Sequence, residues 1–314
     1  MSKLFTGSYY RITGVPRSRA EKTHHTYRNY LECFGKFLQD KYSNPSALFT
    51  QLNVRPATFE IDEKVVRRFL FIAWNTEYLS SLNDSQKVEI LKTNNQWKPI
   101  QIYYAAYSLG EAVSLLIDGK NPESHNACID KVNRLFVESL KIEPWCFAYN
   151  GNRRGGYKDV NLPAGTTPTS NLKQDISNRF GIIARCLRAE HDNQVDDFEP
   201  RKLSLAQKLR GEKKKLQIDF DPSYTTLFDF LYRLRIKSNY KDAEIFLVDC
   251  PDESTQSISK NLSIIGYYTL MLMESYIIKK WDKEKFLKLA KEYLKTAGAD
   301  ESRLKHRVTF YSTL

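Results

Sequence analysis

The sequence is poor in residues that interrupt or cross-link a chain. Its 314 residues include 13 glycines, 11 prolines and 5 cysteines. Few glycines and prolines favour long helices over a β-sandwich with many turns. The cysteines are odd in number and widely spaced, with no Cys-x-x-Cys pair, so neither a disulfide framework nor a zinc ribbon is expected. We expect them to be small core residues in a reducing cytoplasm.

Common catalytic and targeting motifs are also missing. The sequence contains no P-loop, dinucleotide-binding glycine motif, zinc-protease helix motif or nucleophile elbow. The residues after Met1 lack the apolar stretch of a signal peptide. Glu274 interrupts the most apolar window, 261–278, which therefore predicts a buried helix rather than a membrane span. We expect no cofactor, no bound metal and no membrane partner.

Basic and aromatic residues are plentiful. Lysine and arginine number 48 against 37 acidic residues, which gives a formal net charge of +11. Aromatic residues make up 13% of the chain, which excludes a globally disordered protein. The basic surplus favours a polyanionic partner, provided that it clusters.

Apolar residues recur at spacings of three and four along most of the chain, which predicts an all-α protein built as a helical bundle. Helices are expected at 24–42, 62–82, 84–93, 99–118, 124–140, 171–191, 223–238, 241–249, 255–281 and 282–298. A long loop is expected at 142–170, where glycine and proline are concentrated. Strand-like pieces occur only near 10–12 and 215–220.

Two segments resemble the HEPN superfamily, whose small helical domains occur in prokaryotic toxins, CRISPR effectors and other antiviral systems. The first, 103–125, has an aromatic helix, a glycine break and a Ser-His start to the next helix. The second, 231–240, has Leu-x-x-Leu-Arg before a Ser-Asn-Tyr, and Asn239 departs from the aspartate of the family. The resemblance implies a HEPN-like core at 97–250 with a long basic insertion at 142–222. Around it we expect an N-terminal helical region (1–95), a C-terminal helical hairpin (254–298) and a polar tail (299–314).

The ribonuclease branch of this superfamily carries an arginine followed, after four to six residues, by a histidine. Arg185 and His191 match with five residues between them, and Arg19 and His24 match with four but lie outside the core. The resemblance implies a metal-independent endoribonuclease in which His191 moves a proton and Arg185 stabilises the scissile phosphate, with one site shared by a dimer.

The spacing of this pair leaves a second interpretation open. On one continuous helix the side chains of Arg185 and His191 lie about 120° apart around the axis. They converge only if the helix ends or kinks between them, or if a partner chain completes the site. Otherwise they are solvated residues near a helix end.

Two basic segments are candidates for binding nucleic acid. The glycine-rich loop 149–158 supplies Arg153, Arg154, Tyr157 and Lys158, which combine charge with base-stacking rings. The second segment, 201–215, concentrates basic residues against a single acid: Arg201, Lys202, Lys208, Arg210, Lys213, Lys214 and Lys215. The alternatives are a mobile surface loop for the first and a solvated charged face for the second.

Three further features concern single side chains. Arg233, Arg235 and Lys237 alternate along a helix and cannot all face one side, so one of them is expected to line a ligand or dimer groove and the others to be solvated. His125 is expected to pack on the neighbouring helix at a helix start. The tyrosines at 103, 104 and 107 are expected in the core.

These features predict a cytoplasmic, HEPN-like RNA-binding protein in an antiviral defence or toxin–antitoxin system. RNA is favoured over DNA, and the chain is expected to form a homodimer or to join a larger complex. It is either a metal-independent endoribonuclease or a non-catalytic subunit that binds nucleic acid or a protein partner. A DNA-binding scaffold of unrelated helical fold is a third reading.

Overall fold

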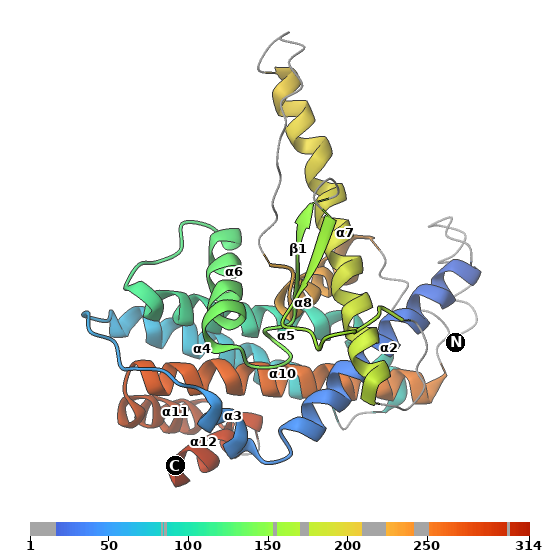
Figure 1. The fold of residues 1–314 in the computed structure, drawn as a ribbon. Helices are drawn as coiled ribbons and strands as arrows, with labels where there is room; N and C mark the ends of the chain where they lie inside the picture. Colours follow the sequence, from blue (N-terminus) through green and yellow to red (C-terminus); the bar gives the residue numbers. More distant parts are fainter. Residues whose placement is uncertain are drawn as a thin grey trace. The chain divides into compact units, whose positions relative to one another are not determined.

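The computed structural model describes residues 17–82, 84, 87–152, 156–169, 176–208, 224–241, 251–299 and 302–314. These residues are mostly helical, as the sequence predicts, apart from one small two-stranded sheet (Figure 1). The chain divides into two compact units: unit 1 comprises 1–132 and 231–314, and unit 2 comprises 133–230. The two boundaries fall inside helices, and each unit is described by itself.

Unit 1 is built around two long helices, α5 (Val88–Asp118) and α10 (Asp252–Lys280), which pack side by side (Figure 1). Helix α4 (Glu63–Ser81) packs against α5, and α2 (Arg17–Lys41) packs against α10. The remaining elements of this unit are α3 (Pro45–Gln51), most of α6 (His125–Arg134), the end of α8 (Leu227–Ile236), the π-helix η2 (Lys237–Lys241), α11 (Lys283–Ala297) and α12 (Arg303–Thr313).

Local sequence signals set several of these helix ends. The Asp62 side chain accepts hydrogen bonds from the backbone amides of Lys64 and Val65 at the start of α4. Helix α5 ends at Gly119, whose φ of 77° lies in the left-handed region. A β-carbon there would also lie 3.0 Å from the Phe59 ring, so the position suits glycine on two grounds.

Helix α5 corrects one expectation from the sequence. Separate helices are expected at 84–93 and from residue 99 onward, but α5 runs without interruption from Val88 to Asp118 with Pro99 inside it. Proline cannot donate a backbone hydrogen bond, and the sequence therefore suggests a break. The helix stays continuous because α4 and α10 pack along it and bury Pro99 together with its neighbours Lys98 and Ile100.

Among the described residues, α5 is also the one helix that is long enough and apolar enough to cross a membrane. Its most apolar window is 72% buried inside the structure, so the helix is a core element of unit 1. The window around Glu274 forms α10 and is buried, as predicted. Four cysteines, Cys33, Cys128, Cys146 and Cys186, are free and buried, and Cys250 lies outside the described residues.

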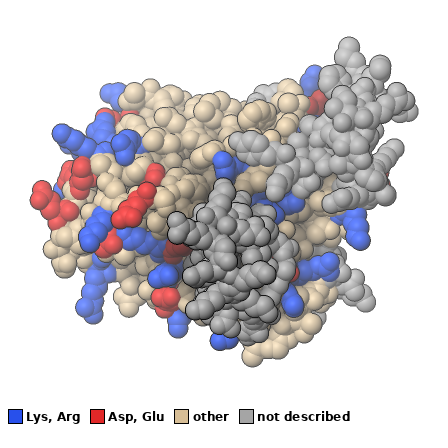
Figure 2. Space-filling model, turned by 90° about the horizontal axis from the view of Figure 1, so that it is seen from above, with Lys and Arg blue, Asp and Glu red and all other residues tan. Residues whose placement is uncertain are grey.

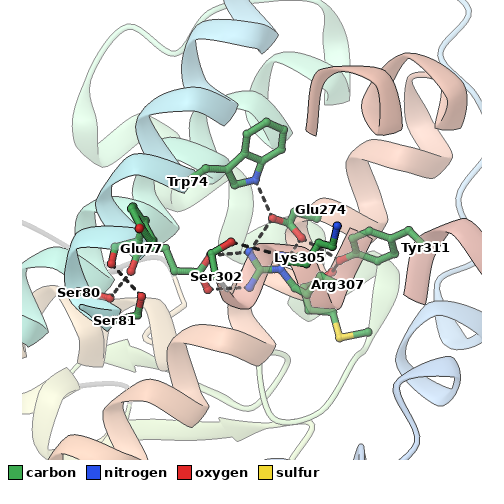
Figure 3. Close-up of polar contacts among 11 residues, drawn as sticks. Trp74, Glu77, Ser80, Ser81, Glu274, Ser302, Lys305, Arg307 and Tyr311 are labelled. Atoms are coloured by element: carbon green, nitrogen blue, oxygen red, sulfur yellow. Dashed lines mark hydrogen bonds and ion pairs between the residues drawn. The ribbon is translucent and has the colours of Figure 1, made fainter. Parts of the chain in front are cut away.

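The C-terminal residues form a packed helix where the sequence suggests a polar tail. Leu304, Arg307, Val308 and Tyr311 are buried along one face of α12. Arg307 donates hydrogen bonds to Glu77 of α4 and to Glu274 of α10, which ties three helices together (Figure 3). The charged residue at the centre of this face hides its helical periodicity, because an arginine counts as polar in the sequence pattern.

Unit 2 contains the end of α6, the π-helix η1 (Leu135–Leu140), strands β1 (Ala148–Asn152) and β2 (Gly156–Val160), α7 (Ile176–Lys208) and the start of α8. The strands form an antiparallel hairpin with Tyr149 opposite Asp159, and β1 lies against α7 (Figure 1). The sequence suggests only a loop here. Gly151 permits close pairing, because a β-carbon on it would lie 2.4 Å from the Gly156 carbonyl oxygen. The strand-like pieces at 10–12 and 215–220 and the helix after residue 241 lie outside the described residues.

Candidate nucleic-acid interface

His191, the predicted proton-transfer residue, lies in the interior of unit 2. Its side chain is fully buried, and both ring nitrogens form hydrogen bonds. Nδ1 lies 2.8 Å from the Thr225 hydroxyl, and Nε2 lies 3.0 Å from the Gly151 carbonyl oxygen. A carbonyl oxygen only accepts, so Nε2 carries a proton. The ring also meets Tyr157 edge-on at 4.8 Å, and it is therefore held on every side by its own unit.

Arg185 lies on a different face of the same helix. Its side chain is exposed, whereas His191 is buried, and α7 continues unbroken through both positions. The condition for convergence, an end or kink between the two residues, is not met. The structure therefore does not bring the predicted catalytic pair together within one chain. For the second candidate pair, His24 is buried on α2, and the side chain of Arg19 lies outside the described residues.

A chain of hydrogen bonds gives His191 a structural role. The Thr225 hydroxyl donates to Oε1 of Gln194 at 3.2 Å, and Nε2 of Gln194 donates to Asp229 at 3.0 Å. The other oxygen of Asp229 accepts from Nδ2 of Asn133 at 2.9 Å. These side chains connect the end of α6, the middle of α7 and the start of α8 within unit 2. Buried polar networks that are fully bonded in this way fix one arrangement of the surrounding helices.

The predicted phosphate-binding loop is partly visible as the hairpin. Tyr157 is half-buried on β2 and Lys158 is exposed beside it, whereas Arg153 and Arg154 lie outside the described residues. The guanidinium of Arg188 lies 6.0 Å from the Tyr157 ring centre. Since His191 also contacts this ring, Tyr157 is engaged by side chains of its own unit.

The basic segment 201–215 falls largely beyond the described side chains. The backbone of Arg201, Lys202 and Lys208 belongs to the end of α7, and nothing is described of their side chains. Arg210, Lys213, Lys214 and Lys215 lie outside the described residues. In the space-filling view, the basic side chains of the described part are spread over the visible face and are interspersed with acidic ones at one end (Figure 2).

Arg235 is the predicted nucleic-acid residue with the most distinctive surroundings. It lies on α8 within unit 1, and its guanidinium is 5.3–5.7 Å from the ring centres of Tyr103, Tyr104 and Tyr232. Cations at such distances from aromatic rings are attracted by their electron-rich faces. Its Nε is buried and makes no hydrogen bond within the described structure. Its neighbour Arg233 is half-buried on the same helix and has contacts of its own.

His125 completes this group. Its ring stacks on Tyr107, with 4.1 Å between ring centres and 21° between planes, and its Nε2 is hydrogen-bonded to the Tyr103 hydroxyl. The prediction that it packs on the neighbouring helix is confirmed, but the side chain is only half-buried. Burial, together with the nearby charge of Arg235, lowers the pKa of His125, so the ring is neutral at pH 7.

We call this group the Arg235 cluster. It consists of Tyr103, Tyr104, Tyr107, His125, Tyr232 and Arg235. Tyr103 is buried, as expected for the core, but Tyr104 is 39% exposed, which corrects the expectation that all three tyrosines of α5 are core residues. The cluster joins the two sequence segments, 103–125 and 231–240, that carry the family resemblance. The site could have been identified by pairing these two segments, but neither segment alone shows that their side chains meet.

The cluster has the chemistry needed to hold unpaired bases. Tyrosine and histidine rings stack on bases, and an arginine adds cation–π attraction and charge for phosphate. No group of three or more histidine, cysteine or acidic side chains that could hold a metal ion occurs among the described residues.

Comparisons with known proteins do not place the chain in a family. No protein-family model matches it. No curated protein and no solved structure matches it either. The HEPN resemblance therefore stays a prediction from the sequence.

Proposed function

We propose that this chain is a cytoplasmic RNA-binding protein of the HEPN-like kind that holds unpaired bases on the Arg235 cluster, in a defence or toxin setting. The observation that carries the proposal is the packing of the Arg235 guanidinium against three tyrosine rings beside a half-buried histidine. The net charge of +11 supports a polyanionic ligand. Contacts of this type tolerate many sequences, since every base has a stacking face.

His125 supplies a reason to favour RNA over DNA. The Nε2 atom of its neutral ring can accept a hydrogen bond from the Tyr103 hydroxyl, which puts the single ring proton on Nδ1. Nδ1 makes no hydrogen bond to the described residues and can donate to a ribose 2′-oxygen. The 2′-hydroxyl is the group that distinguishes RNA from DNA at such a site.

Between the two forms of this function, we favour the non-catalytic one. The observation behind this choice is that His191 uses both ring nitrogens inside unit 2 while Arg185 faces outward on α7. The protein then acts as a binding subunit, as a homodimer or within a larger complex. A metal-independent ribonuclease built on this pair would require a second chain to complete its site.

Binding of a fluorescein-labelled single-stranded 12-mer RNA, followed by anisotropy, tests the proposal. Arg235→Ala and Tyr232→Leu should each weaken binding by about 1–3 kcal/mol, or roughly 5- to 150-fold. Arg55→Ala is the matched control, because Arg55 is an exposed arginine of unit 1 outside the cluster. Equal affinity in the cluster variants and the control would contradict the proposal.

The catalytic alternative is tested with the same RNA in EDTA. We expect no cleavage by the wild-type protein. Cleavage that disappears in Arg185→Ala would establish the ribonuclease instead, since Arg185 is exposed and its removal should not disturb folding.

A further inference from the structure

A second candidate site lies elsewhere in unit 1. A cavity of about 970 Å³ is lined by residues of α2, α5, α10 and α12, together with Asp84 just before α5. Its volume lies at the upper end of the range of small-molecule sites. None of its lining residues belongs to the Arg235 cluster.

The cavity has an apolar and aromatic wall. Leu91, Ile264 and Tyr267 line it, and Tyr267 and Tyr268 are both half-buried. The Tyr268 ring meets Tyr267 edge-on at 5.4 Å, and its hydroxyl donates to the backbone oxygen of Tyr42 at 3.1 Å. These contacts fix the two rings in place, so the wall offers a preformed surface for a planar group.

Two acidic side chains of the cavity are already balanced by cations. Asp84 forms ion pairs with both Lys98 and Arg303. Glu32 lies 3.8 Å from Nε of Arg28 and accepts a hydrogen bond from a serine. The two carboxylates are therefore paired with three basic side chains in total.

The mouth adds further positive charge. Lys36 and Lys260 line the cavity, are exposed, and form no ion pair within the described part of the chain. Glu253 is the remaining acidic residue of the lining, and it too is exposed. The lining itself holds three acidic and three basic side chains, but Arg28 and Lys98 pair with Glu32 and Asp84 from outside it. Lys36 and Lys260 are thereby left as the cations that can bind an anion.

Small polar side chains also line the cavity. Ser257 and Asn261 sit one helical turn apart on α10, and Gln39 lines the cavity from α2. Hydroxyl and amide groups of this kind bind the edges of heterocycles and sugar hydroxyls.

We propose that this cavity binds a mononucleotide, with its base against Tyr267 and Ile264 and its phosphate at Lys36 and Lys260. The ring surface, the hydrogen-bonding groups and the basic mouth match the three parts of such a ligand. The site is separate from the RNA surface of the proposed function and does not depend on it.

Isothermal titration calorimetry on the full chain tests the proposal with AMP, GMP, CMP and UMP. At least one should bind saturably, more tightly than both its nucleoside and inorganic phosphate. Lys36→Glu/Lys260→Glu should weaken that binding at least tenfold, whereas Lys288→Glu, which changes an exposed lysine of α11, should leave it unchanged.

Three results would overturn the assignment. They are no saturable binding of any of the four nucleotides, equal binding of inorganic phosphate alone, or full binding by the double variant. Arg235→Ala separates this proposal from the RNA surface, because it should weaken RNA binding and leave nucleotide binding intact. Loss of nucleotide binding in Arg235→Ala would place the nucleotide on the Arg235 cluster and reject the cavity.

Discussion

Replacing Arg307 by methionine should strongly destabilise unit 1. The arginine is fully buried between two carboxylates: it reaches Glu274 at 2.7 Å through Nε and Glu77 at 2.6 Å through a terminal nitrogen (Figure 3). Trp74 and Tyr311 each donate a further hydrogen bond of 2.9 Å to Glu274. Burial alone would lower the pKa of Arg307, but Glu274 and Glu77 raise it above its ordinary value, so the cation is held firmly.

The magnitude follows from what the substitution leaves behind. Methionine fills much of the space but leaves Glu77 and Glu274 buried without their cation. Breaking a buried ion pair in this way costs about 3–5 kcal/mol. For a unit of this size, each kcal/mol lowers the melting temperature by about 2–4 °C, so we expect a fall of about 6–20 °C.

A compensated variant tests the reasoning itself. In Glu77→Met/Glu274→Gln/Arg307→Met both carboxylates are removed, and the glutamine keeps an oxygen to accept from Trp74 or Tyr311. Most of the lost stability should return, because replacing a complete buried ion group is often neutral.

Thermal unfolding followed by circular dichroism at 222 nm measures all three proteins. A methionine variant that melts within about 2 °C of the wild type would show that the network contributes little. A triple variant no more stable than Arg307→Met would refute the argument that unpaired carboxylates cause the loss.

Three further predictions concern single side chains. An NMR titration should give His125 a pKa below its ordinary value of about 6.5. As the pH falls below 6.5, the unfolded chain then binds more protons at this residue than the folded chain, so the stability that His125 contributes decreases. A measured pKa above 6.5 would contradict the effect of burial. Burial raises the pKa of the Cys128 thiol to about 12. In a Cys250→Ala background this thiol should therefore react with Ellman's reagent at pH 8 only after the protein unfolds. Rapid labelling of Cys128 in the native protein would contradict its buried position. His191→Ala should cost about 2–4 kcal/mol, because it removes a fully buried ring and leaves the Gly151 carbonyl oxygen without its side-chain partner. Arg185→Ala should change stability by less than about 0.5 kcal/mol in urea titrations, and equal losses would contradict the different burial of the two residues.

The sequence predicts local structure well where periodicity and caps agree. The helix expected at 62–82 is observed at Glu63–Ser81 with Asp62 as its cap, and the helix expected at 282–298 begins after Asp282 and ends before Gly298. Both signals act within a few residues, so they can be read without knowledge of the fold.

Tertiary packing explains why the sequence predictions were wrong at α5 and α12. Pro99 suggests a helix boundary, but packing on both sides of α5 keeps the helix continuous. The periodicity of α12 is disguised by Arg307, whose burial depends on carboxylates from two distant helices.

The candidate functional residues also depend on contacts that are distant in the sequence. The spacing of Arg185 and His191 is visible in the sequence, but the burial of His191 depends on Gly151, forty residues away. The Arg235 cluster depends on contacts between α5, α6 and α8, which residue types and spacing do not reveal. Its two halves are nevertheless recognisable as the segments that carry the family resemblance.

Photochemical crosslinking would locate the bound RNA on the protein. The wild-type protein would be irradiated with single-stranded RNA containing 4-thiouridine, and the adducts would be mapped by mass spectrometry. We predict adducts on Tyr104, His125 or Tyr232 of the Arg235 cluster. Adducts confined to the hairpin at 149–158 and the basic segment at 201–215 would contradict RNA binding at the Arg235 cluster and would place the RNA on unit 2.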